Sequence, residues 1–125
     1  MHDMGYVHND LKLDNILIGS KDPKTIYLID FGLSCSYLNA DGQHVEKEYI
    51  QKFSGNFIFA SLNSCRGYNK SRRDDMQSLI YVMVFMLNGG LPWSDFHKKF
   101  KDRDFAFKDF LRERVDIKYM REFFK

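Results

Sequence analysis

The chain has 125 residues, of which 44% are hydrophobic and 16% aromatic. This content predicts one globular domain with its own core and excludes an intrinsically disordered chain. Its 19 basic and 17 acidic residues leave a net charge of only +2, so charge indicates neither a nucleic-acid nor a membrane partner.

The cysteines indicate a reducing compartment, and the apolar runs indicate neither a membrane span nor a secretory signal. Cys35 and Cys65 stand alone, without a CxxC pair, so neither a zinc site nor a disulfide framework is expected. The apolar run from Leu79 to Leu87 is too short to cross a bilayer, and no secretory signal follows Met1. We therefore expect a cytoplasmic or nuclear protein.

The segment VHNDLKLDN, residues 7–15, is the first distinctive feature of the chain. It places several charged and amide side chains within a few positions of one another, between apolar residues. Because Asp and Asn often cap turns, a solvated turn explains such a run as well as an active-site loop does. From these residues alone, both interpretations stay open.

Two short β-branched runs follow, at residues 15–18 and 25–29. The segment between them, Gly19-Ser20-Lys21-Asp22-Pro23-Lys24, is typical of a turn, so the pattern predicts a small hairpin. Residues 33–60 show no sustained period and contain the turn sequence Asn39-Ala40-Asp41-Gly42. They are predicted to form a long loop, and such loops in compact domains often carry function.

One long helix is predicted over about residues 72–88. Ser71 and Asp74 have the spacing of a capping box at its start, and two glycines after Asn88 end it. Because the side chains from Leu79 to Leu87 are apolar all round, we expect this helix to be buried on nearly every side as a central pillar.

The residues beyond 96 mix aromatic and aliphatic side chains with charged ones, at spacings of three and four. This spacing predicts one or two amphipathic helices that pack on the pillar. The run Lys98-Lys99-Phe100-Lys101 is interpreted as a solvated face, with direct nucleic-acid binding as the less favoured alternative.

Two motifs in the first third of the chain change the interpretation of residues 7–15. The sequence His8-Asn9-Asp10-Leu11-Lys12-Leu13-Asp14-Asn15 fits the protein-kinase catalytic loop H-R-D-L-x-x-x-N at every defined position except the second. After the predicted hairpin, Asp30-Phe31-Gly32 matches the metal-binding D-F-G. Either motif alone is weak, but the two in this order argue against an accidental match.

Three later segments narrow the resemblance. They are Ser61-Leu62-Asn63, the sequence SRRDDMQSL at residues 71–79, and Gly90-Leu91-Pro92-Trp93. These are similar to the S-I-N, S-R-R-D-D-L-E-S-L and S-L-P-W elements of the casein kinase I family of serine/threonine protein kinases. The resemblance covers about residues 3–96.

This resemblance implies a mainly α fold, α+β overall, that forms the central part of a protein-kinase C-terminal lobe. A small β hairpin would carry the catalytic loop, residues 8–15, and the D-F-G, residues 30–32. The activation segment would span residues 30–63, and the buried central helix about residues 72–88. Residues 1–125 would then be a partial kinase domain.

The resemblance also implies roles for four side chains. Asp10 would be catalytic, because it orients the substrate hydroxyl and accepts its proton, and Lys12 would be both catalytic and cofactor-binding, on the γ-phosphate. Asn15 and Asp30 would bind the cofactor as oxygen ligands of Mg²⁺. The implied cofactors are ATP and Mg²⁺, and the implied partners are proteins with Ser or Thr acceptors, not nucleic acid or membranes.

Two further residues have architectural roles by the same resemblance. Asp75 would tie the long helix to the backbone of the catalytic loop. His8 would be structural and pack near Phe31.

Three residues depart from the kinase patterns. Asn9 replaces the Arg that pairs with an activation-loop phosphate, so regulation by such a phosphate is not expected. Asn56 and Ile58 stand where casein kinase I has the Thr and Arg of G-T-x-R-Y-A. The loss of that Arg puts the family's preference for phosphorylated or acidic substrates in question.

The sequence contains no Gly-rich loop and no V-A-I-K lysine. We therefore expect an N-lobe upstream in a full-length protein, and no activity from these 125 residues alone. The competing hypothesis is a non-catalytic kinase-like module that binds a partner through the same lobe. A small basic nucleic-acid binder is a weaker third.

Overall fold

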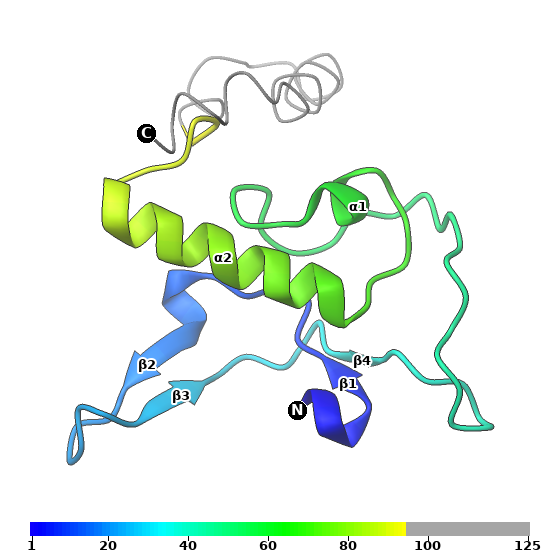
Figure 1. Ribbon diagram of the computed structural model, residues 1–125, viewed down its shortest axis with the longest axis horizontal. Helices are drawn as coiled ribbons and strands as arrows, with labels where there is room; N and C mark the ends of the chain where they lie inside the picture. Colours follow the sequence, from blue (N-terminus) through cyan, green and yellow to red (C-terminus); the bar gives the residue numbers. More distant parts are fainter. Residues whose placement is uncertain (95–125) are drawn as a thin grey trace. The chain divides into compact units, whose positions relative to one another are not determined.

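The computed structural model of the protein describes residues 1–94 (Figure 1). The chain divides into two compact units, Met1–Met83 and Val84–Lys125. The described elements are, in chain order, the 3-10 helix η1 (His2–Met4), strand β1 (Tyr6–Val7), the 3-10 helix η2 (Leu13–Asn15), strands β2 (Ile16–Ile18), β3 (Ile26–Leu28) and β4 (Cys35–Ser36), and helices α1 (Leu62–Cys65) and α2 (Arg72–Asn88). Helices thus occur together with two small antiparallel strand pairs, of which the hairpin was predicted.

Strands β2 and β3 form the predicted hairpin. They pair antiparallel, with Leu17 opposite Tyr27. In the turn, Gly19 N donates to Thr25 O at 2.8 Å, and Thr25 N donates to Asp22 O at 3.0 Å. A Cβ atom on Gly19 would lie 2.6 Å from Asp22 O, so this tight turn requires glycine.

Strands β1 and β4 form a second antiparallel pair, in which Tyr6 lies opposite Ser36 and Val7 opposite Cys35. This pair was not predicted, because two residues are too few to show the period of a strand. Strand β4 therefore interrupts the long loop predicted over residues 33–60.

The start of α2 is built from carboxylate and hydroxyl contacts. Ser61 caps α1 by accepting the Ser64 N–H at 3.0 Å, and its hydroxyl donates to Asp74 Oδ1 at 2.5 Å. Asp74 Oδ2 accepts the Ser71 N–H at 2.8 Å, which is the acidic half of the predicted capping box. The predicted bounds of the long helix are confirmed, since α2 runs from residue 72 to residue 88.

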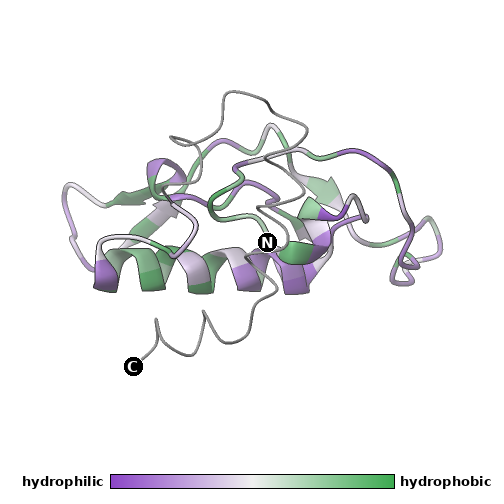
Figure 2. Ribbon diagram, turned by 90° about the horizontal axis from the view of Figure 1, so that it is seen from above, coloured by the Kyte–Doolittle hydropathy of each residue, from purple (hydrophilic) through white to green (hydrophobic). Residues whose placement is uncertain are grey.

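The expected burial of this helix on nearly every side is wrong for the residues that the structure describes. One face of α2 is buried, and Met76, Ile80 and Met83 are each about half exposed. Figure 2 shows apolar and polar residues interspersed along α2. Apolar composition permits burial, but burial itself needs a neighbouring segment, and within residues 1–94 such segments cover one side. The buried residues are Asp74, Asp75, Ser78, Tyr81 and Val82.

The core of the first unit joins residues from widely separated parts of the chain. Its buried apolar side chains are Val7, Leu11, Tyr37, Phe59, Ala60, Cys65, Tyr81 and Val82. In the second unit Trp93 is buried. The helices predicted beyond residue 96, and the run at 98–101, lie outside the described residues. None of the helices up to residue 94 is both long and apolar enough to traverse a membrane.

Candidate active site

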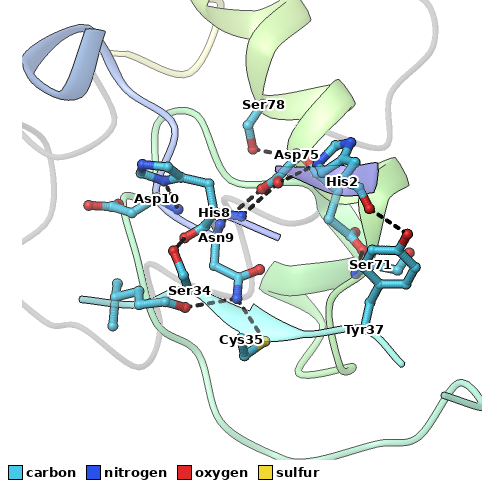
Figure 3. A network of polar contacts seen from close by, with 12 residues as sticks. His2, His8, Asn9, Asp10, Ser34, Cys35, Tyr37, Ser71, Asp75 and Ser78 are labelled. Atoms are coloured by element: carbon cyan, nitrogen blue, oxygen red, sulfur yellow. Dashed lines mark hydrogen bonds and ion pairs between the residues drawn. The ribbon is translucent and has the colours of Figure 1, made fainter. Parts of the chain in front are cut away.

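Asp75 of α2 anchors the start of the polar segment 8–15 (Figure 3). Its Oδ2 accepts the His8 N–H at 2.7 Å, and its Oδ1 accepts the Asn9 N–H at 2.9 Å. Carboxylates that accept backbone N–H groups make stronger hydrogen bonds than neutral acceptors do. The predicted tie between the long helix and this segment's backbone is confirmed.

His2 is a further partner of this carboxylate that the sequence did not reveal. Its Nε2 lies 2.8 Å from Asp75 Oδ2 (Figure 3). No spacing or motif connects two residues that are 73 positions apart, so only the fold could find this contact.

Asp10, Lys12 and Asn15, three of the four predicted site residues, lie together in one cluster. Asp10 Oδ2 accepts from Lys12 Nζ at 2.9 Å and from Asn15 Nδ2 at 3.2 Å. Asn15 Nδ2 also donates to the backbone oxygen of Asp10 at 2.9 Å. One side of the Asp10 carboxylate is therefore fixed by two donors.

The other carboxylate oxygen of Asp10 is free. Asp10 is 8% exposed, and its Oδ1 is buried without a hydrogen-bond partner among the described residues. A buried acceptor with no donor is costly, and such atoms are expected where a ligand completes the site. This oxygen could accept a proton or a hydroxyl hydrogen bond from a bound molecule.

Lys12 carries a stable positive charge between carboxylates. The hydrogen bond to Asp10 raises the pKa of Lys12, and the nearby charges of Asp10, Asp14 and Asp30 add to this effect against partial desolvation. Lys12 therefore remains a cation through the neutral range. A cation at this place suits a phosphate group.

Asp30, the fourth predicted residue, follows β3 at the edge of this cluster. The preceding residue, Ile29, donates its N–H to Asn15 O at 3.1 Å, which brings the two ends of the hairpin together. Asp30 itself is exposed and has a left-handed φ of 62°, and its Oδ1 accepts from Gly32 N at 3.3 Å. The turn thus holds the carboxylate outward beside the Asp10 cluster.

The oxygen donors of this edge suit a magnesium ion. The amide nitrogen of Asn15 is occupied by Asp10, which leaves its amide oxygen as the free end. Asp30 adds an exposed carboxylate. Mg²⁺ takes few protein oxygens and fills its octahedron with phosphate and water. In the part of the chain that the structure describes, no three His, Cys, Asp or Glu side chains are grouped so that they could hold a metal ion.

His8 is structural, as predicted. It is 1% exposed, its Nε2 lies 3.1 Å from Ile29 O, and its ring centroid lies 5.3 Å from that of Phe31. These contacts join the residue before Asp10 to the segment that follows β3.

Asn9 and Asn56 use their side chains within the fold. Asn9 Nδ2 donates to Leu33 O at 2.9 Å, and to Cys35 Sγ at 3.1 Å (Figure 3). Asn56 Oδ1 accepts the N–H of Ile58 at 2.8 Å, which closes a local turn. At residue 9, a neutral amide cannot attract a phosphate as Arg does.

Comparison with known proteins decides the family. The family model described as protein kinase domain matches residues 1–122 of the chain. The chain belongs to the protein kinase family. Among its relatives, a probable casein kinase I homolog of Encephalitozoon cuniculi is 38% identical over 95 residues, which are 76% of this chain. The casein kinase 1-like protein HD16 of Oryza sativa subsp. japonica is 41% identical over 103 residues, or 77% of this chain.

These relatives are longer proteins. This kinase chain spans 29% of the length of the Encephalitozoon cuniculi protein and 14% of the length of the rice protein. The predicted resemblance to casein kinase I is confirmed at the level of these relatives.

Proposed function

We propose that this chain is the catalytic part of the C-terminal lobe of a serine/threonine protein kinase of the casein kinase I type. It would transfer the γ-phosphate of ATP to Ser or Thr hydroxyl groups of protein substrates. The observation that carries this proposal is the cluster of Asp10, Lys12 and Asn15, in which one buried carboxylate oxygen is left without a partner.

In this proposal residues 8–15 are the catalytic loop and Asp10 is its base. The substrate hydroxyl donates to Asp10, which orients its oxygen toward the γ-phosphorus. As the new O–P bond forms, the bond from the γ-phosphorus to the β,γ-bridging oxygen breaks, ADP leaves, and the hydroxyl proton moves to the Asp10 carboxylate. Because two donors already hold Oδ2, the unpaired Oδ1 is the oxygen that would accept the hydroxyl proton.

Lys12 and the hairpin edge would hold the phosphates. The Lys12 ammonium places positive charge on the transferred group, where charge is spread over the peripheral oxygens. Asn15 and Asp30, the latter in the D-F-G at residues 30–32, would hold Mg²⁺. When bound, this ion neutralises charge on the ATP phosphates.

A non-catalytic kinase-like module is not favoured, because the four residues that this lobe would contribute to transfer, Asp10, Lys12, Asn15 and Asp30, are all present. In support of this, Asp10 contacts both Lys12 and Asn15 in the described part of the chain, and Ile29, next to Asp30, donates its N–H to Asn15 O. A binding module has no need for an unpaired buried carboxylate oxygen.

The test is phosphate transfer by a chimaera in which a casein kinase I N-terminal lobe precedes Met1. With Mg²⁺ and ATP we expect phosphorylation of a Ser/Thr peptide and none of its Ala-substituted copy or of a Tyr peptide. A cooperative unfolding transition would first show that the chimaera is folded. A folded chimaera that binds Mg²⁺-ATP but transfers no phosphate would contradict the proposal and favour the binding module.

A further inference from the structure

Asn9 is held in an unusual backbone conformation from two sides. Its φ is 68°, in the left-handed region that side-chain-bearing residues rarely adopt. Its N–H donates to Asp75 Oδ1 at 2.9 Å, and its carbonyl oxygen accepts from Lys70 Nζ at 3.3 Å. Asp75 lies in the first turn of α2, and Lys70 lies just before this helix. The start of α2 therefore binds both the backbone N–H and the backbone C=O of Asn9, the residue before Asp10.

Lys70 also binds a second loop, at Ser54. Its Nζ also donates to Ser54 O at 2.6 Å and to Ser54 Oγ at 3.1 Å. An ammonium group has three donors, and all three of these are directed at Asn9 or Ser54. Lys70 therefore joins two loop segments that are far apart in sequence, one at Asn9 and one at Ser54.

Gly55 shows how closely these two loops meet. Its φ is 101°, and a Cβ atom there would lie 2.7 Å from Asn9 O, the same oxygen that Lys70 contacts. The same Cβ would lie 3.3 Å from Asp10 Oδ1, the unpaired carboxylate oxygen. The Ser54–Gly55 backbone therefore forms a wall that packs against that oxygen.

We propose that Lys70 is a positioning residue, which clamps the Ser54–Gly55 wall onto the Asn9 backbone and so sets the space in which a protein substrate presents its hydroxyl to Asp10. This inference rests on the proposed function for the identity of the substrate. The clamp itself rests on geometry alone.

The surroundings of Lys70 support a clamp. Burial lowers the pKa of Lys70, while the negative charges of Asp10, Asp74 and Asp75 act in the opposite direction. Desolvating an ammonium is costly, and its three contacts offset that cost here. With its donors already used, Lys70 has none left to recognise an acidic or phosphorylated substrate residue.

Hydrogen exchange of the full 125-residue chain tests the clamp without any activity. Lys70→Met should raise the exchange rates of amides in residues 52–60 and 9–12 by on the order of tenfold, because these segments are no longer joined. Lys21→Met, on the exposed hairpin turn, is the matched control and should change neither segment.

Ser54→Ala provides a second variant if Lys70→Met does not fold. It removes one of the three contacts and should raise exchange in the same two segments to a smaller degree. Unchanged protection in residues 52–60 in the folded variants would overturn the clamp, whatever the kinase assay shows.

Kinetics of the chimaera then test the positioning role. We expect Lys70→Met to raise KM for the peptide on the order of tenfold and to leave KM for ATP within about twofold, since the wall faces the hydroxyl side of Asp10. Neutral and acidic peptides should be affected by the same factor. A larger loss for acidic peptides would overturn the clamp in favour of direct substrate recognition. Transfer absent from the unsubstituted chimaera would count against the proposed function and leave the exchange result standing.

Discussion

Asp75 Oδ2 accepts the backbone N–H of His8 at 2.7 Å, although 67 positions separate the two residues. This contact gives the polar loop its fixed starting point. The same carboxylate receives the next N–H along the chain, from Asn9, so the backbone direction entering Asp10 is set by one buried side chain.

Removal of this carboxylate should weaken the fold. In Asp75→Ala two backbone N–H groups lose a charged acceptor, and we expect the free energy of unfolding to fall by about 3 kcal/mol. Urea unfolding of the full chain, followed by circular dichroism, measures this. Asp41→Ala, in an exposed turn, is the control and should change it by less than about 0.5 kcal/mol. Equal effects of the two substitutions would contradict the anchoring role.

Asp10→Asn should remove transfer and leave nucleotide binding. The amide cannot accept the hydroxyl proton, so kcat of the chimaera should fall by at least about 100-fold. Because Asp10 faces the hydroxyl and not the phosphates in the proposed function, the dissociation constant of Mg²⁺-ATP should stay within about twofold. Calorimetry and peptide phosphorylation measure the two quantities. A variant as active as the unsubstituted chimaera would remove Asp10 from the mechanism.

Asp30→Ala should act on the metal. Loss of a proposed magnesium ligand is expected to weaken ATP binding in the presence of Mg²⁺ by on the order of tenfold or more. Binding of ATP in excess chelator should hardly change, because no metal is then bound. Titrations of the chimaera with and without Mg²⁺ separate these effects. If Mg²⁺ strengthens ATP binding equally in both proteins, Asp30 is not a ligand.

Activity should not depend on phosphorylation of the long loop. Asn9 offers no charge, and its amide nitrogen already donates to Leu33 O and Cys35 Sγ. Phosphatase treatment of the chimaera should therefore leave its rate within about twofold, since no guanidinium is lost from a phosphate. A severalfold loss would show that another cation replaces the missing Arg. The loop contains five hydroxyl side chains that phosphatase treatment would cover, Ser34, Ser36, Ser54, Tyr37 and Tyr49.

Lys70 and Lys12 should contribute differently to the change in the free energy of unfolding at alkaline pH. Burial lowers the pKa of Lys70 from 10.5, so between its folded pKa and 10.5 the unfolded chain binds more protons than the folded chain. The free energy of unfolding gains a positive slope with pH in that window, and Lys70→Met should lose this contribution.

Lys12 provides the control for this measurement. Its pKa is raised from 10.5, so the stability it contributes is fully present below 10.5 and is lost only as pH rises through its folded pKa. Lys12→Met should therefore leave the slope below 10.5 unchanged. Urea unfolding at several pH values measures all three proteins, and identical slopes for Lys70→Met and the unsubstituted chain would contradict the assignment.

Several features of this kinase chain were predictable because their causes are local. The hairpin follows from two β-branched runs around a tight turn at Gly19, and the bounds of α2 follow from Asp74 at its start and the glycines after Asn88. The kinase motifs could be recognised because their spacing is fixed along the chain. In the same way, Asp10, Lys12 and Asn15 lie within six positions of each other, so their cluster needs only one loop.

Tertiary structure alone decided the features that join distant segments. The β1–β4 pair, the contact of His2 with Asp75 and the bridge from Lys70 to Ser54 leave no periodic or spacing signal in the chain. The burial of a single face of α2 by segments within residues 1–94 belongs to the same class. An apolar side chain at Ile80 can be buried, but whether it is buried depends on which segment packs against it, and the sequence of the helix does not contain that information.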